Sequence, residues 1–213
     1  MNFIQSNKWL LPSLIFSAVL ILTRVAFTGS LYFLFLLWNL FLAAIPLYMA
    51  GKLEYASSKM IGWTYAGLWL LFFPNAMYIV TDLFHLKEQD DMPLWFDLLL
   101  LLSAALNGVI MGFISLFHVE KWMNGFMKKK HIPVAIFGLL LLCGYGIYLG
   151  RYERWNSWDI VAQPFALLLN IKHHVTHPIR NMDTWAVSVS FGVWMYLLYR
   201  FMRRLNTNLV SRN

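Results

Sequence analysis

The sequence predicts an all-α membrane protein, a bundle of six transmembrane helices with one further helix at the membrane surface. Of the 213 residues, 60% are hydrophobic and only 13% are charged, whereas a typical soluble domain carries roughly 25% charged residues. The mean hydropathy is +0.58. The apolar residues gather in runs close to the roughly 20 residues that a helix needs to cross a bilayer. A soluble enzyme, a nucleic-acid-binding domain and a disordered tail are therefore excluded.

Six apolar stretches are long enough to span the membrane. The predicted transmembrane helices cover residues 9–28, 31–50, 61–80, 94–119, 133–150 and 184–201. A seventh stretch, residues 158–171, has only 14 residues and is interrupted by Gln163 and Pro164. We expect it to form an interfacial or re-entrant helix. No repeat or low-complexity linker is visible, so the sequence indicates one integral membrane domain, residues 1–213.

The distribution of charged residues predicts that both termini face the cytoplasm. With six spans and the N-terminus inside, the cytoplasmic segments hold eleven lysines and arginines and the opposite side holds five. Acidic residues divide the other way, with two inside and eight outside. Lysine and arginine accumulate on the cytoplasmic side of membrane proteins. A seventh span would export the arginine-rich C-terminus, which argues against it. The net charge of +7 therefore reflects topology and not nucleic-acid binding.

Polar residues follow the outer end of the third predicted span. Asn75, Tyr78, Asp82 and His85 are separated by three, four and three residues, so a continuous helix would place them along one face. That stripe would descend about 15 Å into the membrane at 1.5 Å per residue. Pro74 removes a backbone hydrogen bond, and we expect a kink just below Asn75.

A second polar segment, residues 150–159, follows the fifth span. Its arginines could hold an anionic group through bidentate hydrogen bonds, and its tryptophans could stack beside that group. Polar groups inside a membrane usually face a bundle interior or a watery cavity. We therefore predict a cavity that opens to the extracytoplasmic leaflet. Its predicted substrate-binding residues are Asn39, Asn75, Tyr78, Arg151, Arg154, Trp155, Asn156, Trp158 and Asp159, and its predicted catalytic residues are Asp82, His85 and Asp97.

Acid–base chemistry is the reaction type that these residues favour. Asp82 or Asp97, partly desolvated beside the arginines, could take or give a proton, and an imidazole such as His85 titrates near neutral pH. Structural roles stay open for the same residues. Asn39 and Asn107 could be simple interhelical hydrogen-bonding partners, and Asp82 could form an interfacial ion pair with Arg151 or Arg154.

No resident metal is predicted, and the sequence does not identify a cofactor of any other kind. The weak metal candidates are two pairs with ligand-like spacing, Asp82 with His85 and His173 with His177, but no established metal motif is present. We expect His173, His174 and His177 to form a solvated cluster in a loop. Haem held between helices would need histidines at the same depth in the membrane. His85 is expected at the outer edge and His118 at the inner edge, so haem is not expected. The single cysteine, Cys143, can form no intrachain disulfide.

Several of these motifs together resemble a known family. The runs Phe73–Asn75, Thr81–Asp82, His85–Leu86, Gly150–Arg151 and Arg154–Asp159 resemble the bacterial integral-membrane family catalogued as domain of unknown function 1361. The resemblance covers most of the chain. It implies a multi-pass protein of the bacterial cytoplasmic membrane and implies no established reaction. Met77 departs from the family pattern, in which a proline is expected at that position.

The predicted function is the binding, with or without chemical processing, of a lipid-linked or otherwise amphiphilic anionic substrate at the outer leaflet. Arg151 and Arg154 would hold the anionic group, and Asp82 would act as the acid–base group with the support of His85. Membrane lipids are the expected partners, and no oligomeric state is indicated. Two other classes stay open: a small transporter or channel subunit, although the inner half of the spans is almost purely apolar, and a non-enzymatic assembly protein.

Overall fold

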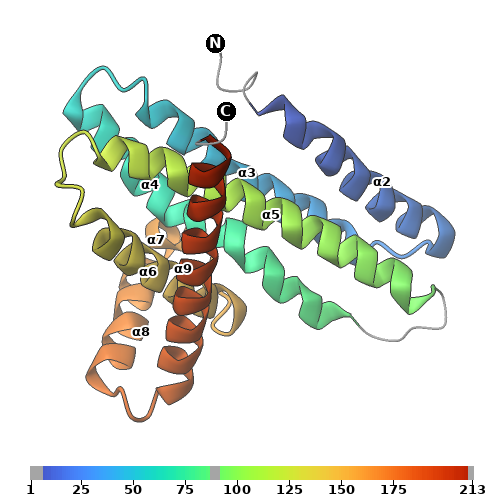
Figure 1. Ribbon diagram of the computed structural model, residues 1–213. Helices are drawn as coiled ribbons and strands as arrows, with labels where there is room; N and C mark the ends of the chain where they lie inside the picture. The colour runs from blue at the N-terminus through green and yellow to red at the C-terminus, as the bar shows by residue number, and fades with distance from the viewer. Residues whose placement is uncertain (1–6, 87–91, 211–213) are drawn as a thin grey trace. The chain divides into compact units, whose positions relative to one another are not determined.

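The computed structural model describes residues 7–86 and 92–210 (Figure 1), and the architecture is all-α. Helices account for 83% of the chain. The α-helices are α2 (Leu11–Thr28), α3 (Phe35–Leu53), α4 (Lys59–Tyr78), α5 (Leu94–Met123), α6 (Ile132–Arg151), α7 (Asp159–Ala162), α8 (Pro164–Thr176) and α9 (Met182–Val210). Three 3-10 helices accompany them, namely η1 (Lys8–Leu10), η2 (Tyr32–Leu34) and η3 (Ile79–His85).

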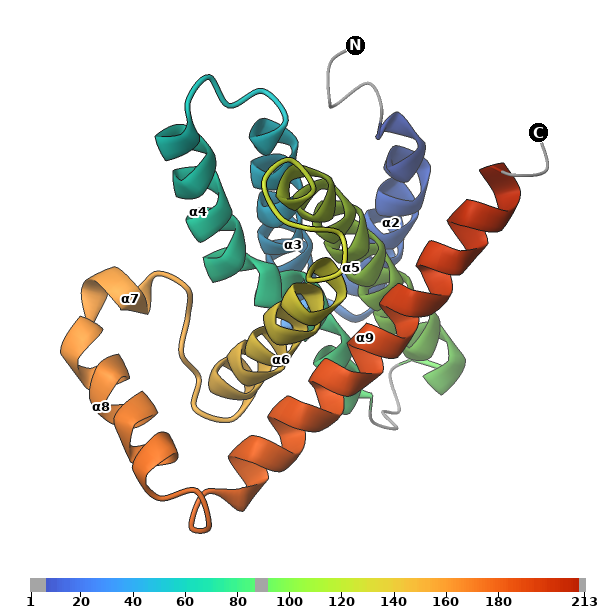
Figure 2. The same ribbon diagram turned by 60° about the vertical axis from the view of Figure 1, so that its left-hand side comes forward.

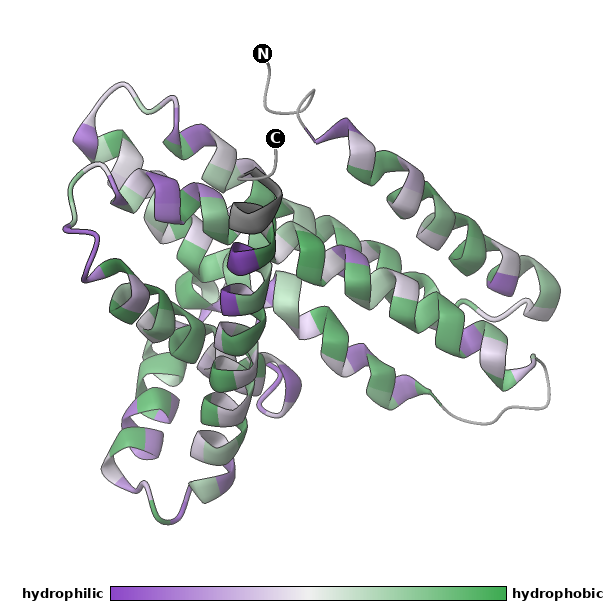
Figure 3. Ribbon diagram, viewed as in Figure 1, coloured by the Kyte–Doolittle hydropathy of each residue, from purple (hydrophilic) through white to green (hydrophobic). Residues whose placement is uncertain are grey.

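Five helical segments among the described residues are long and apolar enough to cross a membrane. They are Lys8–Thr28, Tyr32–Leu53, Lys59–His85, Leu94–Met123 and Ile132–Arg151, and each contains most of one predicted span. Figure 3 shows mainly apolar residues along these helices. The sixth predicted span lies within α9. The apolar character of α9 is interrupted by serines, by Tyr196 and Tyr199, and by Arg200. That α9 spans the membrane therefore stays a prediction.

The chain divides into two compact units, Met1–Trp122 and Met123–Asn213. The single domain expected from the sequence, residues 1–213, stays a prediction.

In the first unit, α3 and α4 lie side by side (Figures 1 and 2). The buried core includes Leu36, Leu40, Ala76, Leu101 and Ala104 from α3, α4 and α5. Ala76 and Ala104 in this core are small residues, which let membrane helices approach closely.

A short turn connects α2 to the next helix. Gly29 has a φ of +66° and ends α2, where its N–H donates to the Val25 carbonyl. Glycine adopts this left-handed conformation without steric cost. The turn places the beginning of the second predicted span next to the end of the first, and one group of polar residues of this unit lies there.

The third predicted span changes its helical geometry within the polar stripe. The α-helix continues through Pro74 to Tyr78 and is followed by the 3-10 helix Ile79–His85. A 3-10 turn has three residues, so Asp82 and His85 share a face there. The expected single α-helical stripe is therefore split after Tyr78. Helix ends commonly tighten in this way because i to i+3 bonds satisfy carbonyls that would otherwise lack partners. The kink expected near Asn75 stays a prediction.

In the second unit, α6 and α9 pack against each other along closely spaced backbones. A Cβ atom added at Gly144 of α6 would overlap the Ser188 carbonyl oxygen of α9, and one added at Gly192 of α9 would lie 2.9 Å from the Leu141 Cα atom. The contact between these helices therefore depends on glycine in both.

Residues 158–171, predicted to form one interfacial or re-entrant helix, are helical, but the helix is divided in two. Figure 2 shows α7 and α8 meeting at an angle, with the break at Gln163. Pro164 opens α8 because proline suits the first turn of a helix and cannot continue the preceding one. The second helix also extends past the predicted end, to Thr176.

A polar cluster lies at the C-terminal end of α3. The Glu54 carboxylate Oε1 lies 2.9 Å from His118 Nδ1 and 3.1 Å from Lys121 Nζ, both on α5. Burial raises the pKa of the Glu54 carboxyl, but the hydrogen bonds and positive charges of His118 and Lys121 outweigh this effect and hold that pKa below its ordinary value.

We expect the stability of the protein to fall on acidification because of Glu54. A carboxyl with a lowered pKa in the folded state contributes stability above its unfolded value of 4.5, and that stability is lost as the pH falls through the lowered pKa. Glu54→Gln should lower the melting temperature near pH 7 by about 1–4 °C. Below pH 4.5, the melting temperature of this variant should decrease less steeply with pH than that of the natural protein. Asp183→Asn, at an exposed acid of α9, should keep the slope of the natural protein. Equal slopes in all three proteins would contradict this assignment.

Candidate functional site

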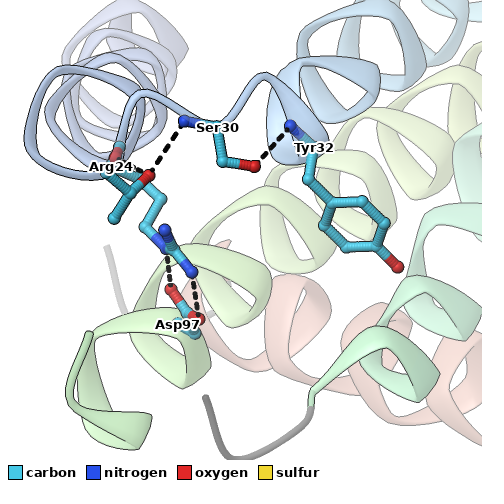
Figure 4. Close-up of polar contacts among 5 residues, drawn as sticks. Arg24, Ser30, Tyr32 and Asp97 are labelled. Carbon is cyan, nitrogen blue, oxygen red and sulfur yellow. Dashed lines mark hydrogen bonds and ion pairs between the residues drawn. The ribbon is translucent and has the colours of Figure 1, made fainter. Parts of the chain in front are cut away.

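Polar side chains of the first unit gather where α2 and η3 end and where α3 and α5 begin. One of these contacts is an ion pair between α2 and α5: Arg24 Nε lies 2.9 Å from Asp97 Oδ1, and Nη2 donates to Oδ2 at 3.4 Å. The two side chains are 2% and 3% exposed. Arg24 also lies over the Phe33 ring, 5.4 Å from its centroid. Figure 4 shows the guanidinium and the carboxylate facing each other.

The turn between α2 and η2 is held by local hydrogen bonds beside this pair (Figure 4). The Thr28 hydroxyl donates to the Arg24 carbonyl at 2.8 Å and accepts from the Ser30 N–H at 3.2 Å. The Tyr32 N–H donates to Ser30 Oγ at 3.3 Å. These bonds set the direction of the chain, and the Tyr32 ring points away from the ion pair.

Asp82 is buried and hydrogen-bonded to the second span. The Asn39 amide Nδ2 donates to Asp82 Oδ2 at 2.7 Å, and Asp82 is 1% exposed. The structure thus brings together two of the residues predicted from the sequence, 43 positions apart. A buried carboxyl needs hydrogen bonds or neighbouring charge, or it takes up a proton. The Asn39 amide supplies one such hydrogen bond to the Asp82 carboxyl.

His85 lies beside an aromatic cluster at the start of α3. Its Nδ1 atom lies 2.8 Å from the Tyr32 hydroxyl, and the Tyr32 and Phe35 rings stand edge-on to the imidazole with centroids 5.8 and 5.1 Å away. The hydrogen bond fixes the ring orientation of His85. Tyr32 was not predicted as a site residue, although its place at the outer end of the second span was a usable signal.

The remaining candidates on α4, Asn75 and Tyr78, are both half-buried. The Thr81 hydroxyl donates to the Tyr78 carbonyl at 2.7 Å, which stabilises the transition from α4 to η3. These residues lie within three turns of His85 along the same helical segment.

Asn107 has the structural role that the sequence left open. Its Nδ2 atom donates to Ser17 Oγ at 2.9 Å and to the Ser13 carbonyl at 3.1 Å, and the Ser17 hydroxyl donates to Ser103 Oγ at 3.0 Å. These bonds join α2 to α5 inside the apolar part of the unit.

In the second unit, the segment after α6 forms a tight turn. Arg154 has a φ of +60°, and the Trp155 N–H donates to the Leu149 carbonyl at 3.0 Å. Asp159 is buried, and its Oδ2 atom accepts from the Asn156 N–H at 2.7 Å. Asp159 thus stabilises the turn that precedes α7. The other predicted binding residues of this segment differ in exposure: Arg154, Asn156 and Trp158 are exposed, whereas Arg151 and Trp155 are half-buried.

The expectation that His173, His174 and His177 form a solvated loop cluster is wrong for the loop and for His174, although His173 and His177 are exposed. His173 and His174 lie on α8 and His177 ends it, because the helix that Pro164 opens continues until just before Pro178. His174 is 3% exposed, and its Nδ1 atom lies 3.0 Å from the Tyr145 hydroxyl of α6.

The structure offers no support for a metal site at the weak candidates. The rings of His173 and His177 stack with centroids 4.9 Å apart, and His177 Nδ1 lies 2.9 Å from the Thr176 hydroxyl. Within residues 7–86 and 92–210, no group of three or more His, Cys, Asp or Glu side chains is arranged to hold a metal ion.

A family model described as "Protein of unknown function (DUF1361)" matches residues 38–198. The chain belongs to this family. The matched DUF1361 region contains all twelve predicted catalytic and binding residues, whereas Arg24 and Tyr32 precede it. The family description names no activity, so membership transfers no chemistry to these residues. No curated protein and no solved structure matches the chain significantly. Membership and the five apolar helices together indicate a membrane protein.

Proposed function

We propose that this protein of the bacterial cytoplasmic membrane binds a lipid-linked or amphiphilic anionic ligand from the extracytoplasmic leaflet and processes it by acid–base chemistry. The observation that carries the proposal is the buried contact between Asp82 and Asn39 next to the pair of Tyr32 and His85. These four polar side chains lie at the ends of apolar, membrane-length helices. Ionisable residues at such positions are costly and usually functional.

The proposed topology has six spans with both termini in the cytoplasm. It takes α9 as the sixth span and places α7 and α8 at the outer membrane surface. Support comes from the excess of lysine and arginine on the cytoplasmic side. The exposed apolar side chains Phe165, Leu168 and Leu169 of α8 suit the boundary between headgroups and acyl chains.

In the proposed mechanism, Asp82 exchanges the proton and Asn39 holds the carboxyl in place. His85, oriented by Tyr32, donates or accepts a second proton. Asp97 was an equal candidate in the sequence, but both of its oxygens bind Arg24. We therefore give Asp97 a positioning role, in which it fixes α2 against α5.

The part of the proposal that concerns anion binding rests on the sequence alone. Arg151 and Arg154 would hold the anionic group, because guanidinium groups bind phosphate and carboxylate through paired hydrogen bonds. Trp155 and Trp158 would anchor or stack against the headgroup. The further proposed contacts are Asn75, Tyr78, Asn156 and Asp159.

Native mass spectrometry of the purified protein tests both parts. The protein would be reconstituted in nanodiscs of phosphatidylglycerol or of phosphatidylcholine, and retained lipids would also be identified after purification from cells. We expect preferential retention of the anionic lipid and a loss of about tenfold in occupancy for Arg154→Ala. Asp82→Asn should keep the ligand but change the ratio of unprocessed to processed species. Asp183→Asn serves as the control at an exposed acid. If Arg154→Ala keeps the lipid occupancy of the natural protein and Asp82→Asn keeps its ratio of unprocessed to processed species, the proposal is wrong.

A non-enzymatic assembly role is the second candidate, and one observation favours it. Asp97 and Asp159 bind other parts of their own unit, as residues with a structural role do. In that case Asp82→Asn would lower the melting temperature without changing the retained lipids.

A further inference from the structure

The helix α8 packs on its unit through one buried residue, His174. Of its thirteen residues, all of them described, His174 is the only buried one. The apolar side chains Phe165, Leu168 and Leu169 are 80%, 61% and 65% exposed. A surface helix normally buries an apolar stripe against its domain. Here the buried position is titratable, so the docking of α8 depends on polar contacts.

His174 makes two polar contacts, and a third bond orients its acidic partner. Its Nδ1 atom lies 3.0 Å from the Tyr145 hydroxyl of α6. Its Nε2 atom lies 3.8 Å from Oε1 of Glu153, in the segment that follows α6 in the chain. The Asn170 amide, one turn earlier on α8, donates to Glu153 Oε2 at 3.2 Å. The imidazole therefore lies between a phenol and a carboxylate, with Asn170 orienting that carboxylate.

This geometry accommodates both protonation states of the imidazole. A hydroxyl can donate or accept, so the bond between Tyr145 and Nδ1 persists in either state. The distance of 3.8 Å between Nε2 and Glu153 is longer than a hydrogen bond. A proton on both ring nitrogens would turn this contact into a charge-assisted one, which is roughly twice as strong as a neutral bond. The Glu153 side chain is 32% exposed, which gives water access to the pair.

The other titratable groups around His174 are few among the described residues. On α6, the Tyr148 ring stands edge-on with its centroid 5.8 Å away. On α8 itself, the His173 ring lies 6.4 Å away and would oppose a second positive charge. From α9, Trp185 stacks on Tyr145 and carries no titratable group. Glu153 is the acid that an ion pair joins to His174.

We infer that His174 is a proton-binding latch. Uptake of a proton from water draws Glu153 onto Nε2 and fastens α8 to α6, and loss of the proton releases the helix. The latch residues His174, Glu153 and Asn170 are not among the proposed ligand contacts, and no substrate is required for the latch to work. Its ligand is the proton, and its output is the docked fraction of α8.

The test measures docking directly in the full-length protein. Spin labels would be placed on Lys172→Cys of α8 and on Gly138→Cys of α6, where an added side chain meets nothing within 4 Å. Distance distributions in nanodiscs would be recorded at about pH 5.5 and about pH 8, on either side of the range in which imidazoles titrate. EDTA would be present, so that no metal on His173 or His177 contributes. We expect the ratio of docked to undocked protein to be about tenfold higher at the lower pH.

Two variants and one control make the result decisive. His174→Gln should remove the pH dependence, because the glutamine keeps polar contacts but does not titrate in this range. Glu153→Gln should reduce it several-fold and keeps the hydrogen bond from Asn170, so folding is preserved. His173→Gln, at the neighbouring exposed histidine, should respond like the natural protein. A docked fraction that does not change with pH, that rises with pH, or that still responds in His174→Gln would overturn the inference.

Discussion

Replacing Asp97 by asparagine is expected to destabilise the first unit by about 3–5 kcal/mol. The substitution keeps the size and hydrogen-bonding shape of the side chain but removes its charge. Arg24 is 2% exposed and donates to both Asp97 oxygens, so its buried positive charge would lose the carboxylate that these bonds pair it with. Unfolding of the purified protein by denaturant in detergent, followed by tryptophan fluorescence and size-exclusion chromatography, measures the loss.

A double variant separates charge from packing. Arg24→Met combined with Asp97→Leu removes both charges, and it should recover most of the stability because an apolar pair of similar volume has no desolvation cost. Asp183→Asn, at an exposed acid, should change stability by no more than about 0.5 kcal/mol. If Asp97→Asn were as stable as the natural protein but failed to process its ligand, Asp97 would be a proton-exchange group and not a positioning residue.

The positions of the apolar helices could be predicted closely from the sequence because one physical length decides them. A span must match the hydrocarbon thickness, so the run from Leu94 to Val119 predicted most of α5, which continues to Met123. Gln163 and Pro164 visibly interrupt the seventh apolar stretch, but one helix was predicted there, whereas the structure has two. What periodicity could not reveal is the change to a 3-10 helix after Tyr78, because both helices accept the same spacing of polar residues over one turn.

Partners of the polar residues were harder to predict than their depth. Periodicity shows which residues share a face of one helix, but it does not show which neighbour that face meets. Asp97 lies 73 residues from Arg24, and the sequence grouped it with the catalytic candidates. His174 looked like one of three solvated histidines, and only the packing of α8 on Tyr145 distinguishes it. The neighbour that a helix face meets depends on where two backbones approach closely. Glycines permit this close approach, but a glycine in the sequence does not indicate which helix it will contact.

The second large effect is expected at one of these glycines. Gly144→Ala should destabilise the second unit by about 1–3 kcal/mol or more, because its new Cβ atom would overlap the Ser188 carbonyl oxygen. A backbone atom of a packed helix cannot rotate away as a side chain can, so α6 and α9 would have to separate. That separation would also disturb Cys143 and Met195, whose sulfur atoms lie 3.9 Å apart in the same interface.

Gly138→Ala provides a matched control on the same helix. An added Cβ at Gly138 meets no atom within 4 Å, and alanine favours a helix over glycine by about 1 kcal/mol. The two substitutions make the same chemical change six residues apart in α6, so they should shift the denaturation midpoint in opposite directions. If both substitutions shifted the denaturation midpoint equally, the difference in helix propensity between glycine and alanine would explain both shifts. The close approach of α6 and α9 at Gly144 would then not exist in the folded protein.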